Sequence, residues 1–235
     1  MNIDTDIVKN KTYSSAIEPS LLKHSQEYRV LATLRYLYQE KFNTMTTGEA
    51  PDLQDCVSGI GIEVTSAVKE ETMKVLRVFS DLCQREPEEV SKLENIIKSS
   101  GYSFVSLKDK KVAISTFGTA NGEKYFFQES IRRKMKRLQQ YRENFKEIGL
   151  AIILPGIPTS HAEKHLMEWS FEFLDESSDS FDFVYVISHR FCVYCDAKEN
   201  VTEKHLLTQD ENQMLAKIGR MTAEGELSMT DKEWL

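Results

Sequence analysis

The chain has 235 residues, of which 40% are hydrophobic and 29% charged, a balance typical of a folded globular protein. No apolar run reaches the roughly 18 residues that a membrane span needs, and the polar segment 1–15 lacks the hydrophobic region of a secretory signal. The net charge of −7 counts against a protein that coats nucleic acid non-specifically, because such binding depends on neutralising phosphates. We therefore expect a cytoplasmic protein with no membrane partner.

The four cysteines are too few and too scattered for a disulfide framework, which agrees with a reducing compartment: Cys56, Cys83, Cys192 and Cys195. Cys192 and Cys195 form one CxxC pair in a strand-like run, where alternation sends the two thiols to opposite faces. A lone pair makes no zinc site without further ligands. His161 and His165 are one helical turn apart without an HExxH pattern, so we expect a solvated helix face there.

The first half of the chain begins with a loosely docked arm over residues 1–20. Apolar residues at helical spacing then predict a helix from about His24 to Phe42. Two strand-like runs follow at 51–57 and 59–68, and the turn signal Ser58-Gly59 predicts that they form a hairpin.

The middle of the chain is predicted to hold helices at 70–82 and 86–99, and then a second hairpin that joins runs 102–107 and 111–117. A long helix is predicted from about Lys124 to Ile148, ended by Gly149.

The last part of the chain starts with the continuous apolar run 150–157, which is typical of a strand buried inside a sheet. A helix at 160–176, one or two strands within 181–195, and a helix near Gln209–Glu226 complete the pattern. Strands that alternate with helices indicate an α/β protein.

This pattern divides the chain into three parts. We expect an N-terminal arm at 1–20, an α/β domain at 21–200 with an insertion at about 70–122, and a C-terminal helical extension at 201–235.

Asp52 and Glu63 are the first candidates for chemistry. Side chains alternate along a strand, so Glu63 and Thr65 share one face while Ile62 and Val64 supply the core face. If the hairpin forms, Asp52 lies beside Glu63, and the two carboxylates can chelate one hard cation. Without a cation, two such carboxylates repel each other.

Glu27 lies on the same helical face as the apolar residues Leu31, Leu34 and Tyr38. A carboxylate on that stripe is costly to bury unless it is paired, which makes Glu27 a candidate third ligand. The alternative is an exposed charge in the first turn of the helix, stabilised by the helix dipole.

The predicted helix before Gly149 carries five positive residues within six positions. Four of them project sideways or outward, where they form a binding surface for a phosphate backbone: Arg132, Arg133, Lys136 and Arg137. Lys134 lies at the edge of the buried face, from which its ammonium can reach the carboxylates. The alternative for Lys134 is a lysine that snorkels from an ordinary surface helix.

A helix with Glu27, then Pro51-Asp52, then Glu63-x-Thr65 on a strand, and later a basic helix that leads into an apolar strand, resembles the PD-(D/E)XK nuclease superfamily. The resemblance covers about residues 24–68 and 124–154. It implies a restriction-endonuclease-like core with a mixed central sheet flanked by helices. It also implies that Asp52 and Glu63 bind Mg²⁺ or Mn²⁺, with Glu27 as a further ligand, for the hydrolysis of phosphodiester bonds.

Thr65 departs from that family's pattern, which has a lysine at this position. Two interpretations are possible. Either Lys134 supplies the missing charge, so that Asp52, Glu63 and Lys134 form the catalytic set, or the site is degenerate and the protein is a nucleic-acid or protein interaction module. The expected partner is nucleic acid, DNA in preference to RNA, and a homo-oligomeric state is compatible with either reading.

Overall fold

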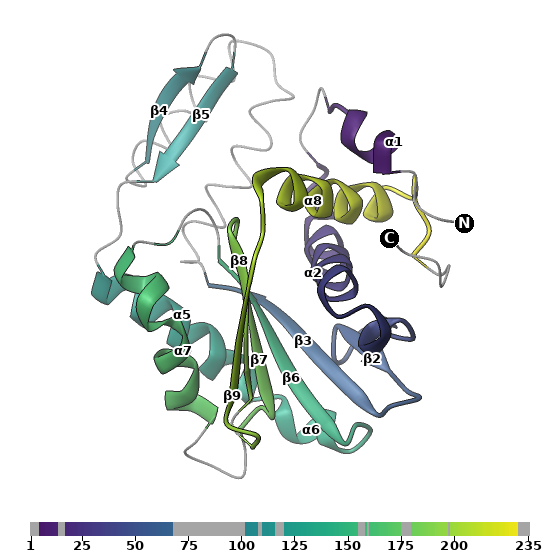
Figure 1. The fold of residues 1–235 in the computed structure, drawn as a ribbon, viewed down its shortest axis with the longest axis vertical. Helices are drawn as coiled ribbons and strands as arrows, with labels where there is room; N and C mark the ends of the chain where they lie inside the picture. The colour runs from purple at the N-terminus through teal and green to yellow at the C-terminus, as the bar shows by residue number, and fades with distance from the viewer. Residues whose placement is uncertain are drawn as a thin grey trace.

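The computed structural model describes most of the chain, in these ranges: 5–13, 17–67, 102–107, 110–115, 120–154, 158, 160–174, 180–196 and 198–229. Its centre is a seven-stranded sheet of order β1-β2-β3-β6-β7-β8-β9 (Figure 1). The strands are β1 (Thr46–Thr47), β2 (Leu53–Asp55), β3 (Ile60–Ser66), β6 (Glu147–Ile153), β7 (Phe183–Ile187), β8 (Phe191–Asp196) and β9 (Val201–Leu206). β3, β6 and β7 run parallel and the outer pairs are antiparallel, so the protein is an α/β protein with a mixed sheet.

Helices cover both faces of the sheet. They are α1 (Thr5–Asn10), α2 (Leu22–Tyr38) with the 3-10 turn η1 (Gln39–Phe42), α5 (Ala120–Met135), α6 (Leu138–Arg142), α7 (Ser160–Leu174) and α8 (Gln209–Ala223). Residues of α2 and α8 pack into one buried cluster with one face of the sheet, and residues of α5, α6 and α7 pack into a second cluster with the other face. Figure 1 shows the two layers on opposite sides of the strands.

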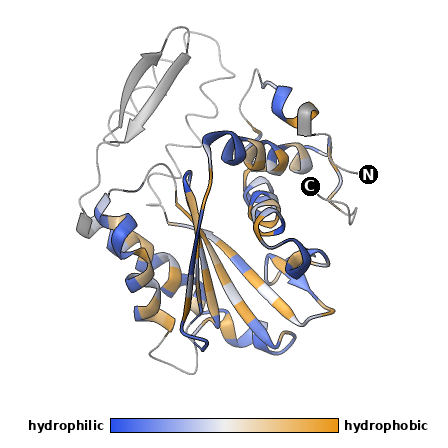
Figure 2. Cartoon of the chain, viewed as in Figure 1, coloured by the Kyte–Doolittle hydropathy of each residue, from blue (hydrophilic) through white to orange (hydrophobic). Residues whose placement is uncertain are grey.

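β6 is the strand buried between these two layers. Ala151 and Ile153 belong to the cluster beneath α2, whereas Leu150 and Ile152 belong to the cluster beneath α5 and α7. Because both faces are covered, the strand is apolar without alternation, and Figure 2 shows the central strands as largely hydrophobic. The prediction of a buried strand after residue 149 is therefore confirmed.

Both predicted hairpins are confirmed. β2 pairs antiparallel with β3 across the turn that contains Gly59, whose φ of 75° lies in the left-handed region that glycine tolerates. β4 (Tyr102–Leu107) pairs antiparallel with β5 (Lys110–Ser115) in a separate two-stranded sheet. The helices predicted at 70–82 and 86–99 lie outside the described residues.

The prediction of one helix from Lys124 to Ile148 is wrong at its C-terminal end. α5 ends at Met135, α6 is a short helix, and β6 already begins at Glu147. Gly149 lies inside that strand, opposite Phe183 in β7. A Cβ atom at Gly149 would lie 1.9 Å from the Phe183 ring, so this glycine makes room for an aromatic side chain and does not end a helix.

The segment from residue 201, expected as a helical extension, supplies both a strand and a helix to the main layers. β9 pairs with β8 at the edge of the sheet, and α8 packs along α2. A reciprocal capping box of Thr208 and Glu211 begins α8. Among the described residues, no helix is both long enough and apolar enough to cross a membrane.

The α2–α8 contact depends on Gly219. A Cβ atom at this position would lie 2.5 Å from the main-chain oxygen of Ser25 and 2.8 Å from the nitrogen of Arg29, and neither atom can move without moving α2. Alanine normally stabilises a helix relative to glycine. We nevertheless expect Gly219→Ala to lower the free energy of unfolding by about 1–3 kcal/mol, because the overpacking cost exceeds the helix gain. Urea unfolding measures this change.

Gln213→Ala is the matched control, since Gln213 is exposed on the same helix. It should change stability by no more than about 0.5 kcal/mol. An unchanged or higher stability of Gly219→Ala would mean that α2 and α8 are not in close contact.

Candidate functional site

Asp52 and Glu63 meet just before β2 begins. In the antiparallel register Leu53 lies opposite Ile62, so the next pair brings Asp52 to the level of Glu63. Both residues are buried, each with 2% exposure. The predicted juxtaposition of these two carboxylates is thus present.

β2 is short, and among the described residues no strand pairs with this edge of β3 beyond Ile62. The amide of Val64 lies past the last β2 pair, and it donates a hydrogen bond of 2.9 Å to Oδ2 of Asp52. A side-chain carboxylate therefore takes the place of a strand carbonyl at this edge. The open edge gives side chains from both helical layers access to Asp52.

Helix α5 brings Lys134 to this edge. Its Nζ lies 2.5 Å from Oε1 of Glu63 and 4.0 Å from Oδ2 of Asp52. The Lys134 side chain is only 21% exposed, so it is not the freely snorkelling lysine of the alternative interpretation. The sequence-based expectation that Lys134 reaches the carboxylates matches the structure.

Helix α2 brings a carboxylate and a second lysine from the opposite layer. Glu27 is buried, with 2% exposure, so it is not the exposed first-turn charge of the alternative. The Lys23 ammonium links α2 to the sheet: it lies 3.0 Å from Oε1 of Glu27 and 3.0 Å from Oδ1 of Asp52. His24 Nδ1 contacts the other oxygen of Glu27 at 2.9 Å.

These contacts shift two pKa values. Burial raises the pKa of Glu27, although Lys23 and His24 oppose this rise because they favour the carboxylate. Burial alone would lower the pKa of Lys23, but its contacts with Asp52 and Glu27 outweigh burial, so that the pKa is raised. Lys23 is therefore firmly held in its charged form by the two carboxylates.

Tyr141 borders the cluster from α6. Its side chain is buried, and burial together with the neighbouring negative charge of Glu63 raises the pKa of its hydroxyl to about 12. Sequence reasoning missed both Tyr141 and Lys23. The i,i+4 spacing of Lys23 and Glu27 was the available signal for the lysine, since such pairs share one helix face.

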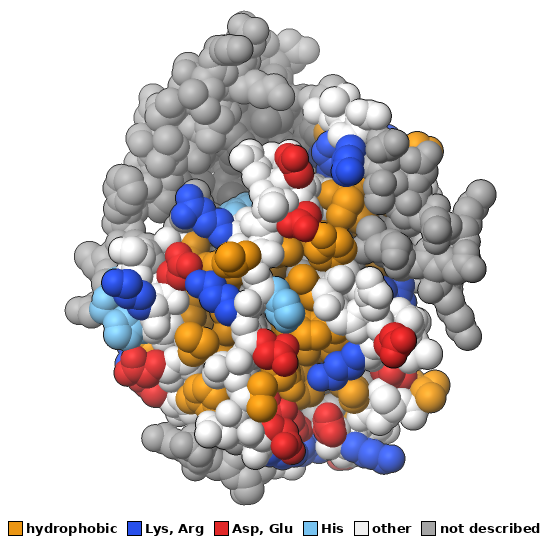
Figure 3. Space-filling model, viewed as in Figure 1, with side chains coloured by type: hydrophobic (Ala, Val, Ile, Leu, Met, Phe, Trp, Pro, Cys, Tyr) orange, Lys and Arg blue, Asp and Glu red, His pale blue; other side chains and the backbone are white. Residues whose placement is uncertain are grey.

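The four basic residues expected to hold a phosphate backbone are all exposed: Arg132, Arg133, Lys136 and Arg137. Two of them contact different neighbours. The Arg132 guanidinium lies over the ring of Phe173 in α7, 5.0 Å from its centroid. Arg133 turns toward the sheet, where Nη2 donates to Oγ1 of Thr65 at 3.4 Å. Among the described side chains on the face seen in Figure 3, cationic and anionic groups are interspersed and form no extended basic surface.

The carboxylates of the cluster have the donor atoms that a divalent ion takes. In the part of the chain that the structure describes, no three His, Cys, Asp or Glu side chains are close enough to hold a metal together. However, Mg²⁺ is usually bound by one or two carboxylates, with water and substrate phosphates as the remaining ligands. Asp52 and Glu63 offer hard oxygen donors of this kind, and Oε2 of Glu63 is buried with no hydrogen-bond partner among the described residues. The residues therefore fit such an ion.

Other polar features lie apart from this cluster. Cys192 and Cys195 point into opposite core clusters, as alternation predicted. His165 contacts Glu168 at 2.7 Å and stacks on Trp169 along the surface of α7.

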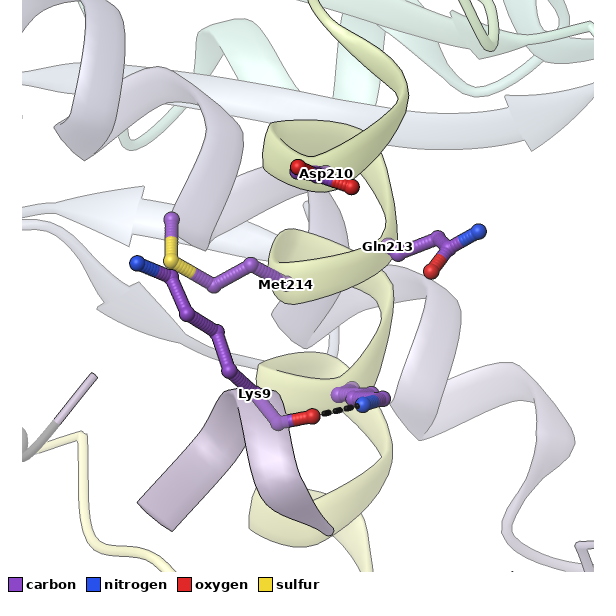
Figure 4. A pocket seen from close by; sticks show the side chains of 5 residues that line it. Lys9, Asp210, Gln213 and Met214 are labelled. Atoms are coloured by element: carbon purple, nitrogen blue, oxygen red, sulfur yellow. Dashed lines mark hydrogen bonds between the residues drawn. The ribbon is translucent and has the colours of Figure 1, made fainter. Parts of the chain in front are cut away.

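A small hollow between α1 and α8 contains none of the candidate residues (Figure 4). It is lined by Lys9, Asp210, Gln213, Met214 and Lys217. The Lys217 ammonium donates a hydrogen bond of 2.6 Å to the main-chain oxygen of Lys9, so this contact joins the two helices.

Comparisons with protein-family models, with curated proteins and with solved structures found no match for this chain.

The Lys134–Glu63 pair permits a direct test of the cluster. Lys134→Met removes the charge but keeps the length of the side chain, and Glu63 is then left buried without its cation. We expect a loss of about 1–3 kcal/mol in the free energy of unfolding, since an unpaired buried carboxylate keeps its full desolvation cost. Chemical denaturation at neutral pH measures the loss.

Lys136→Met is the control for a charge change nearby, because Lys136 is exposed. It should change stability by at most about 0.5 kcal/mol. Equal small losses from both substitutions would contradict the interpretation that Lys134 neutralises Glu63.

Proposed function

We propose that the protein is a metal-dependent nuclease that hydrolyses phosphodiester bonds of nucleic acid with Mg²⁺ or Mn²⁺. The observation that carries the proposal is the convergence of Asp52, Glu63 and Lys134 at the open edge of β3. Two buried carboxylates with a lysine between them, at the boundary of two helical layers, are an arrangement with a clear catalytic use. Such groups are rarely assembled for stability alone, because burying charges costs free energy.

The order of elements around the cluster supports the proposal. α2 precedes the three strands β1, β2 and β3, α5 follows them, and β6 then pairs parallel with β3. This is the helix–strands–helix–strand order that the resemblance to the PD-(D/E)XK superfamily implies. The candidate residues occupy the corresponding places on the first helix, at the start of the hairpin and on its second strand.

Asp52 and Glu63 would hold the ion, and Glu27 is the alternative partner of Asp52, because the three carboxylates do not lie close enough together to share one ion. The ion would polarise the scissile phosphate and lower the pKa of the attacking water. The ammonium of Lys134, beside Asp52 and Glu63, would stabilise negative charge that develops on the phosphate. Exposed Lys136 and Arg137 would contact the flanking backbone phosphates.

Thr65 is compatible with this proposal. Arg133 and Lys134, neighbours on α5, direct their charges to Thr65 and Glu63 respectively. The cationic charge that the superfamily places on the strand is thus delivered from the helix. A threonine at this position leaves space for the Arg133 and Lys134 side chains. A lysine there would place a further positive charge beside Arg133.

A second candidate function is a non-catalytic nucleic-acid or protein interaction module with the same architecture. The observation that favours it is the existing neutralisation of the carboxylates: Lys23 and Lys134 between them contact Glu27, Asp52 and Glu63. A cluster neutralised in this way can be stable without any metal ion.

Thermal unfolding with and without Mg²⁺ or Mn²⁺ tests the metal site. An ion that binds only the folded protein should raise the melting temperature by roughly 5–10 °C at about 100 times its Kd. Glu63→Gln should abolish most of that shift, because it removes a charged ligand. Asp182→Asn serves as the control, since Asp182 is also a buried, ion-paired carboxylate but contacts Arg142 and Lys198 instead.

Asp182→Asn should lower the melting temperature and leave the metal-induced shift intact. A shift that survives in Glu63→Gln would place the ion elsewhere.

Cleavage assays on DNA and RNA separate the two candidate functions. Lys134→Ala should reduce the rate of Mg²⁺-dependent cleavage roughly 100- to 1,000-fold, because it removes a charge that acts on the transition state. Lys136→Ala should mainly weaken binding and make it less dependent on salt. Similar small effects from both substitutions would contradict the role of Lys134.

Absence of cleavage in the wild type would favour the interaction module. In that case, activity gained by Thr65→Lys would identify a degenerate nuclease.

A further inference from the structure

Lys23 is the least buried member of a buried cluster. Its side chain is 66% exposed, whereas Glu27 and Asp52, which its ammonium bridges, are each 2% exposed. The lysine therefore reaches in from solvent and covers two carboxylates that have little other access to water. Its ammonium lies 3.0 Å from an oxygen of each carboxylate, and a divalent cation bound to these two carboxylates would compete with it for that position.

The two lysines of the cluster are held differently. Lys134 is 21% exposed and pairs with Glu63, on the strand that α5 covers. Lys23 lies near the start of α2 and can swing outward by rotation of its side chain alone. Such a movement restores hydration of the ammonium and its rotamer freedom, so that only Lys23 leaves at low cost.

The charges indicate when Lys23 would leave. The formal charges of the three carboxylates and two ammonium groups sum to −1, without counting His24. A divalent cation added to this set would make the sum of formal charges +1 in a largely desolvated place, with three cationic groups close together. Exchange of Lys23 for the ion gives a sum of zero and removes the repulsion between Lys23 and the ion.

We infer that Lys23 is an exchangeable counter-cation: it neutralises Asp52 and Glu27 in the metal-free protein and leaves when a divalent ion binds these carboxylates. This inference rests on the proposed function, because it concerns the same metal site. Lys23 thereby stabilises the metal-free fold and at the same time lowers the affinity of the site for metal.

Mn²⁺ binding, followed by the loss of the electron paramagnetic resonance signal of the free ion, tests this inference without any need for activity. Lys23→Met should bind Mn²⁺ at least about tenfold more tightly than the wild type, because the competing charge is gone. It should also melt at a lower temperature without metal and show a larger rise in melting temperature with metal. Lys23→Gln, which retains an amide donor for the carboxylates, should show the same gain in affinity and serves if Lys23→Met folds poorly.

Lys198→Met is the matched control. Lys198 is 65% exposed and pairs with Asp182, which is 5% exposed, so the substitution removes the same charge from a similar environment outside the site. It should leave the affinity for Mn²⁺ unchanged.

Two results would overturn the inference. Equal Mn²⁺ affinities for the wild type, Lys23→Met and Lys23→Gln would show that Lys23 does not compete with the ion, while the metal site itself would stand. No Mn²⁺ binding to any of these proteins would overturn the inference together with the proposed metal site.

Discussion

Burial of negative charge at the open edge of β3 is the constraint on which this site depends. A carboxylate removed from water is tolerated only where cations or hydrogen-bond donors replace its hydration. Asp52 meets this requirement with three contacts from three elements: the Val64 amide of β3, Lys23 of α2 and Lys134 of α5. One short side chain thus joins the sheet to both helical layers.

The fold supports this arrangement through two local features. β2 begins only at Leu53, so the edge of β3 beyond Ile62 accepts side chains in place of a neighbouring strand. The close approach of α2 and α8 at Gly219 fixes the position of α2 over the sheet, and Lys23 and Glu27 lie near the start of that helix. The geometry of the carboxylates therefore depends on packing well away from them in sequence.

The same charges bear on both candidate functions. Lys134, which neutralises the strand carboxylates without metal, is also the group that a nuclease would need near a phosphate, since it lies beside both of them. The two lysines differ in how they are held: Lys134 is packed against Glu63, while Lys23 is largely exposed. A binding protein gains nothing from a counter-cation that leaves easily, whereas a metal enzyme does, because the exchange keeps the cluster nearly neutral in both states.

The sequence by itself determined the features that depend on local periodicity and spacing. Alternation placed Glu63 and Thr65 on one face of a strand, the turn at Gly59 predicted the hairpin, and helical spacing placed Lys134 at the edge of a buried face. It misplaced the end of the helix before β6, because a glycine after a helical run is also the common signal for a helix C-terminus.

Only the tertiary structure showed that this glycine accommodates the Phe183 ring from a strand far along the chain. It also decided that Lys23 of α2 bridges to Asp52, and that Tyr141 borders Glu63. Periodicity describes which way a residue faces on its own element. Which charge neutralises a buried carboxylate is decided by the elements packed against it.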